Sequence, residues 1–255
     1  MIRFSEIEQT QLAVEPYGWT AIRDLFDPRD AAILAETYPR DQFKTIEGHD
    51  KEKGYRYEAR CLIGMGADRP SHPESLSPSW KRLAADLLSP EYREVMSGLT
   101  GLNLRQAGLE VNVFHYDPGC WLGPHVDLKD KIVTHVFYFN VDWDVRDGGC
   151  LQILRSSRSD DRFAEVLPLV GNSAVLVRSE KSWHAVSRVR EDCLSSRRSM
   201  TVTFYSPGCT STMWPAREPV TLHRRENSVR SGLLSRIRRL LHARFALKSA
   251  GGVHE

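Results

Sequence analysis

The sequence predicts a mainly β fold with helices gathered at its N-terminal side, an α+β arrangement built around a β-sandwich or jelly roll. Two observations support this. From about residue 109, short strand-like segments follow one another, separated by Gly, Pro, Asp or Ser. Before that point, helix-like and strand-like segments are mixed. We expect one domain over residues 1–220, with a supporting region at 1–108 and a core at 109–207, followed by a tail at 221–255.

Three helices and one strand are predicted in the supporting region. In "DPRDAAILAETYP", Asp27 can cap the first turn, Pro28 suits its start, and apolar residues recur at helical spacing. Two further helix candidates are "SWKRLAADLLS" and "EYREVMSGL". Between the first helix and these two, "GYRYEARCLIG" alternates Tyr, Tyr, Ala and Cys with charged residues, as a strand does. The Pro- and Ser-rich segment "GADRPSHPESLSPS" is expected to be a loop.

Seven short strands are predicted in the core. On the last of them, Arg197, Ser199, Thr201 and Thr203 share one face, because residues two apart on a strand point to the same side. Met200 lies on the opposite face, with the apolar residues two and four positions after it. The segments are "LEVNVFHYD", "KIVTHVFYFNV", "GGCLQIL", "EVLPLV", "NSAVLVRS", "HAVSRV" and "RRSMTVTFYS".

Composition narrows the class of protein. A hydrophobic content of 41% with 27% charged residues is ordinary for a globular protein with a buried core. The five cysteines are scattered without a CxxC pair, which argues against a disulfide framework and suits a reducing compartment. The N-terminus does not resemble a signal peptide and no apolar window is long enough to span a membrane, so we expect a cytoplasmic protein.

Charge is unevenly distributed along the chain. Residues 221–255 hold eight Lys/Arg and two acidic residues, a net charge of +6, so the first 220 residues carry −4 of the total +2. A mildly acidic body argues against nucleic-acid binding. In the tail, "SGLLSRIRRLLHARFAL" places its Leu, Ile and Phe residues on one helical stripe. This helix either docks on the domain or on a second subunit, as in a homodimer, or lies on an anionic membrane surface.

The segment "WLGPHVDLKD" contains residues that could form a metal site. His125 and Asp127 are two residues apart at a strand or its end, so an imidazole and a carboxylate can point toward one position. His184, which begins a later strand, can supply a third ligand. Two histidines and one carboxylate on one face select non-haem Fe(II). The pair alone is equally compatible with surface polar residues, and His72 and Glu74 form a similar pair in a loop.

The order of motifs around this pair resembles the 2-oxoglutarate/Fe(II)-dependent dioxygenases, and most closely the branch with the prolyl hydroxylases. The resemblance covers about residues 109–207. Its features are HxD, the aromatic strand ending "YFNVDWD", the "DGG" turn before "CLQIL", a Pro-x-x-Gly turn, a distal His, and an Arg on the final strand. It implies a double-stranded β-helix (jelly roll) core that uses Fe(II), 2-oxoglutarate and O2.

Site residues follow from the resemblance. His125, Asp127 and His184 would bind the iron. Arg197 would pair with the distal carboxylate of 2-oxoglutarate, with Ser199 and Thr201 on the same strand face. Tyr138 is either a further contact to this carboxylate or a core tyrosine on its aromatic strand.

The neighbouring arginine, Arg198, competes with Arg197 for this role. Alternation along the strand favours Arg197 and points Arg198 away, toward solvent. Tyr116, before "DPG", either lines the pocket or belongs to the core.

The implied reaction is hydroxylation of an unactivated carbon, with release of succinate and CO2. The resemblance does not identify the substrate, because substrate contacts come from regions outside it. A free or carrier-bound amino acid, a sugar, a secondary metabolite or a peptidyl residue are all candidates. Two other classes remain open: a cupin-type jelly-roll metalloenzyme that works without 2-oxoglutarate, and a non-catalytic binding protein of the same fold.

Overall fold

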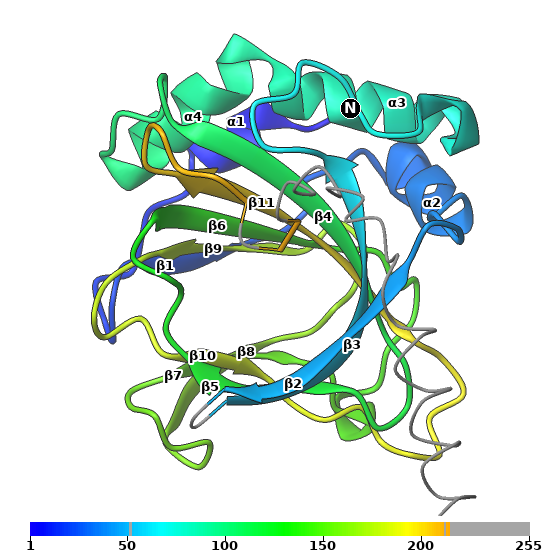
Figure 1. The fold of residues 1–255 in the computed structure, drawn as a ribbon, viewed down its shortest axis with the longest axis vertical. Helices are drawn as coiled ribbons and strands as arrows, with labels where there is room; N and C mark the ends of the chain where they lie inside the picture. Colours follow the sequence, from blue (N-terminus) through cyan, green and yellow to red (C-terminus); the bar gives the residue numbers. More distant parts are fainter. Residues whose placement is uncertain (51–52, 212, 215–255) are drawn as a thin grey trace, which may run out of the picture. The chain divides into compact units, whose positions relative to one another are not determined.

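The computed structural model describes residues 1–50, 53–211 and 213–214, which form four α-helices and eleven strands (Figure 1). The helices are α1 (Phe4–Glu8), α2 (Pro28–Glu36), α3 (Pro78–Leu88) and α4 (Pro90–Thr100). The strands are β1 (Trp19–Ile22), β2 (Lys44–Asp50), β3 (Lys53–Ile63), β4 (Gly108–Tyr116), β5 (Trp121–His125), β6 (Lys131–Tyr138), β7 (Leu151–Leu154), β8 (Arg162–Val166), β9 (Ser173–Val177), β10 (His184–Val186) and β11 (Arg197–Tyr205).

Helix α2 begins as the sequence predicts, whereas α3 begins at Pro78, inside the segment expected to be a loop. Asp27 accepts a hydrogen bond from the backbone N–H of Arg29 at the start of α2. Ser77 and Ser89 cap α3 and α4 in the same way. Each cap is followed by a proline at the first helical position, where the missing N–H costs nothing.

All strand pairs are antiparallel and form one folded sheet, which confirms the jelly-roll fold class. The strand order is β1-β9-β6-β11-β4-β3-β5-β10-β7-β8, with β2 paired to β3. Strand β3 pairs with β4 along its C-terminal half and with β5 near its start, so it passes from one layer to the other. Figure 1 shows the two layers facing each other, with β2 and β3 running between them.

Three strands were not anticipated, and one was misplaced. Strand β1 has only four residues, β2 is largely polar, and β5 contains both Gly and Pro, so none has a clear strand pattern. The prediction that "EVLPLV" forms a single strand was wrong. Strand β8 ends at Val166, two residues before Pro168, which has no N–H to donate to a sheet.

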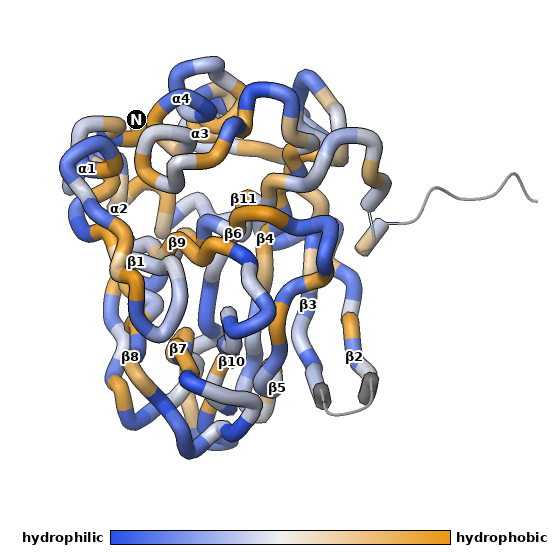
Figure 2. The backbone as a smooth tube through the Cα atoms, turned by 90° about the vertical axis from the view of Figure 1, so that its left-hand side faces the viewer, coloured by the Kyte–Doolittle hydropathy of each residue, from blue (hydrophilic) through white to orange (hydrophobic). Residues whose placement is uncertain are grey.

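The described buried apolar residues form three clusters, of which the largest and one other lie on opposite faces of the larger layer. The helices cover its outer face (Figure 1), where Trp80, Phe137 and Val202 are fully buried in one cluster. The inner face and the smaller layer enclose a second apolar region that includes Val136 and Ile153. In Figure 2 the hydrophobic stretches of β1, β9 and β11 lie beneath the helices.

The predicted basic helix of residues 221–255 lies outside the described residues, so its two interpretations stay predictions. Within the described ranges, no helix is both long enough and apolar enough to cross a membrane.

Candidate active site

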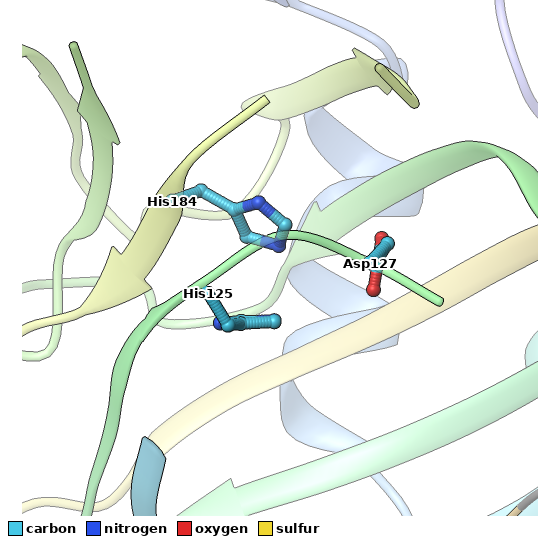
Figure 3. Close-up of side chains that lie close together, drawn as sticks. All are labelled: His125, Asp127 and His184. Carbon is cyan, nitrogen blue, oxygen red and sulfur yellow. The ribbon is translucent and has the colours of Figure 1, made fainter. Parts of the chain in front are cut away.

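The three predicted metal ligands come together at one point inside the jelly roll. His125 ends β5, Asp127 follows two residues later, and His184 begins β10 directly opposite His125 in the antiparallel register. One ligand atom from each residue lies within 4.8 Å of the other two. Figure 3 shows the three side chains converging from these two strands. The spacing of two along the chain and the strand pairing together create the cluster.

Backbone contacts determine which nitrogen of each histidine can bind a metal. Nδ1 of His125 lies 3.0 Å from the carbonyl oxygen of Gly123, and Nδ1 of His184 lies 2.9 Å from that of Ser182. A carbonyl oxygen only accepts, so each Nδ1 must carry the proton and donate it. The lone pair is then on Nε2 of both rings, which makes Nε2 the atom available to a metal, as in many metal sites where a backbone carbonyl orients the imidazole.

Two neighbours orient the Asp127 carboxylate. Lys131 donates to Oδ1 at 3.0 Å and the Thr134 hydroxyl donates to Oδ2 at 2.9 Å. Burial by itself raises the pKa of Asp127, but the positive charges of Lys131, His184 and His125 outweigh it and hold the pKa well below its usual range. The site therefore offers two imidazole Nε2 atoms and one ionised carboxylate, the set that suits Fe(II) and leaves coordination positions open.

The three candidate metal ligands share a cavity with a buried arginine. Arg197, Ser199 and Thr201 line the same cavity as the three ligands. The Arg197 side chain is 2% exposed and donates to the Ser199 hydroxyl at 2.6 Å. Its guanidinium stacks over the ring of Tyr116 at 4.8 Å and near that of Tyr138 at 5.3 Å. No carboxylate of the described residues lies within 4.0 Å of the guanidinium, so it forms no ion pair there.

Two polar atoms beside this cavity are suited to an anionic ligand. Nε of Arg197 and the hydroxyl of Tyr138 are buried and have no hydrogen-bond partner among the described residues. Burial raises the pKa of Tyr138 against the opposing charge of Arg197, so its hydroxyl keeps its proton and can donate. A buried cation with unused donors requires an anion, and the distal carboxylate of 2-oxoglutarate matches this requirement.

Arg198 takes the opposite face of β11, as the alternation predicts, but the expectation that it reaches solvent was wrong. Its guanidinium lies 3.5 Å from the carbonyl oxygen of Ala35 in α2 and stacks over Tyr38 at 5.7 Å. Helix α2 covers this face of the sheet, which the sequence pattern alone does not reveal. The His72 and Glu74 pair lies on an exposed turn, with side chains 56% and 72% exposed.

Two residues at the site were not recognised in the sequence, and the role of a third was left open. Lys131 stands four residues after Asp127, a charge spacing that was visible in "HVDLKDK". Thr134 reaches Asp127 only because β6 runs beside the ligand loop, and nothing in the sequence signals it. Tyr116 was left open between pocket and core, and the structure places it in the cavity wall beneath Arg197.

Comparisons with known proteins agree with this geometry. Residues 111–205 match the 2OG-Fe(II) oxygenase superfamily. The chain is 26% identical over 210 residues to the prolyl 3,4-dihydroxylase OGFOD1 of Ostreococcus tauri, across 76% of this chain but only 38% of that protein's length.

Two solved structures share the fold. A prolyl-4-hydroxylase from Pseudomonas putida superposes with a TM-score of 0.55 at 20% identity, covering 79% of this chain and 97% of the other. A prolyl hydroxylase from Trichoplax adhaerens, solved with a peptide fragment of hypoxia inducible factor, gives a TM-score of 0.57 at 13% identity, covering 79% and 88%.

Proposed function

Since residues 111–205 match the 2OG-Fe(II) oxygenase superfamily, we propose that the chain hydroxylates an unactivated carbon of a small-molecule or peptidyl substrate, with release of succinate and CO2. It is a dioxygenase whose cofactors are Fe(II), 2-oxoglutarate and O2. The observation that carries the proposal is that one cavity is lined by His125, Asp127 and His184 and by Arg197, which forms no ion pair with the described residues.

The protein's part in the reaction is to hold and orient. His125, Asp127 and His184 would hold the metal from one side through two Nε2 atoms and a carboxylate oxygen. Arg197 would bind the distal carboxylate of 2-oxoglutarate, with Tyr138 donating a second hydrogen bond. When bound, Fe(II) and 2-oxoglutarate supply the oxidising chemistry with O2. The apolar and aromatic wall around the site keeps water away and strengthens these polar contacts.

Prolyl substrates are the first to test, because the curated relative is a prolyl 3,4-dihydroxylase. This chain spans 38% of that protein's length, so the relative's activity is only a starting point here. Small amino acids form the second set, since the cavity sits inside the jelly roll and the metal is reached through it. We place the reaction in the cytoplasm, where free thiols are stable.

The decisive experiment is an anaerobic titration of Fe(II) and 2-oxoglutarate into metal-free protein, followed by the visible iron-to-ketoacid charge-transfer band. We expect the band in the wild type and its loss in His184→Ala. The matched control is His72→Ala, an exposed histidine that should leave the band unchanged. Iron binding without any band would favour a cupin-type metalloenzyme instead.

A further inference from the structure

A second buried acidic residue, besides Asp127, lines the same cavity. Glu110 on β4 is 1% exposed and lines the cavity. Its Oε2 accepts hydrogen bonds from Asn112 Nδ2 at 3.1 Å and from the Tyr205 hydroxyl at 3.3 Å. Its other oxygen, Oε1, is buried and has no hydrogen-bond partner among the described residues. Oε1 of Glu110 is therefore available to accept a hydrogen bond from a ligand in the cavity.

The described neighbours of Glu110 donate to only one of its two oxygens. The indole N–H of Trp214 donates to Oδ1 of Asn112 at 2.6 Å, which determines the orientation of this amide. Asn112 therefore presents its NH2 group to Glu110, and Oε2 receives two donors.

This carboxylate has no counter-ion in the described part of the chain. No Lys, Arg or His nitrogen of those residues lies within 4.0 Å of it, whereas the other acid in the cavity, Asp127, is paired with Lys131. A cationic group that donates to Oε1 would satisfy the buried oxygen and pair with the carboxylate. The cavity provides the space for that cation.

Strand pairing places Glu110 in the same row of the sheet as a neighbour of the candidate metal ligands. Thr203 on β11 lies directly opposite Glu110 on β4 and, on its other side, opposite Thr134 on β6. Thr134 is the residue whose hydroxyl binds Asp127. All of these side chains line the cavity, so a molecule held by Glu110 extends along one row of the sheet toward the metal.

From these contacts we propose that Glu110 is a specificity-determining residue that binds a cationic nitrogen, an ammonium or guanidinium group, of the substrate. The proposal rests on the proposed function, because it assigns the substrate class of the same site. The substrate is then an amine, a basic amino acid or a peptide bearing such a group. Asn112, Tyr205 and Trp214 position the carboxylate.

The test uses the full-length protein with Fe(II) and 2-oxoglutarate, kept anaerobic. Probes are matched pairs that differ in charge: arginine and citrulline, lysine and Nε-acetyl-lysine, proline and N-acetylproline, each free and within short prolyl peptides. Binding is followed by the change in the charge-transfer band. We expect at least one cationic member to bind about tenfold or more tightly than its neutral partner, as a charge-assisted hydrogen bond provides.

Variants assign this preference to Glu110. Glu110→Gln should remove it while the affinity for 2-oxoglutarate stays unchanged, and Glu110→Asp, which keeps the charge, should retain it with weaker binding. Glu94→Gln, an exposed acid on α4, is the control. The inference is overturned if no cationic probe is preferred by the wild type, a result that needs no variant, or if the preference survives in Glu110→Gln. Absence of the charge-transfer band in the wild type would instead contradict the proposed function.

Discussion

Replacing Arg197 by alanine should weaken 2-oxoglutarate binding far more than the same change at Arg198. Arg197 is 2% exposed and forms no ion pair with the described residues, so its charge is available to the cosubstrate. Its removal would leave the distal carboxylate buried without a cation. Loss of one partner of such a pair costs about 2–4 kcal/mol, or roughly a 30- to 700-fold rise in Kd.

Arg198 is a matched control, because it is adjacent in the chain and has the same side chain. It lies on the helix-covered face of β11, against Ala35 and Tyr38, so Arg198→Ala should lower stability and leave the Kd for 2-oxoglutarate unchanged. The assay is the anaerobic charge-transfer titration, with the ligand-induced rise in Tm as a second readout. In the wild type this rise corresponds to about 2.7 kcal/mol at a 2-oxoglutarate concentration of 100 times Kd.

The pair of variants separates two ways in which the reasoning can fail. Equal losses of affinity would mean that the effect is general destabilisation rather than loss of a carboxylate contact. A larger loss of 2-oxoglutarate affinity in Arg198→Ala than in Arg197→Ala would place the cosubstrate contact on the helix-covered face of β11. Either result would refute the argument from strand alternation.

Four further changes test the rest of the site and the fold. Asp127→Ala should abolish Fe(II) binding and turnover while the circular dichroism spectrum stays native; succinate production would remove it from the ligand set. Thr134→Val should weaken Fe(II) binding roughly tenfold, since it frees the carboxylate that the hydroxyl orients, and an unchanged metal Kd would contradict this. Tyr138→Phe should raise the Kd for 2-oxoglutarate about 2- to 12-fold with little change in the stability of the metal-free protein, because its hydroxyl has no described partner to lose. Burial lowers the pKa of His135 to about 3 in the folded protein. Between about pH 6.5 and pH 3 the imidazole is therefore protonated in the unfolded chain but not in the folded one, and the free energy of unfolding falls as the pH drops through this range. Denaturant unfolding at pH 6 and pH 5 should show that His135→Gln reduces this slope by about 1.4 kcal/mol per pH unit, whereas the exposed His72→Gln should not.

Local patterns in the sequence were sufficient for much of the fold. The cap Asp27 followed by Pro28, and the alternation of "RRSMTVTFY", are determined by backbone geometry over a few residues. Strands β1, β2 and β5 were missed for the converse reason. They are short, polar or interrupted by Gly and Pro, and their partners on β9 and β3 are what make them strands.

The same division holds at the site. The sequence by itself determined the types and spacing of the metal ligands, and the strand face of Arg197, because both follow from the period of two along a strand. Only the tertiary structure decided that His184 lies opposite His125, that α2 covers Arg198, and that Glu110 is enclosed in the cavity without a cation from the described residues. These are relations between segments far apart in the chain. They depend on how the two layers fold over each other, which no local pattern specifies.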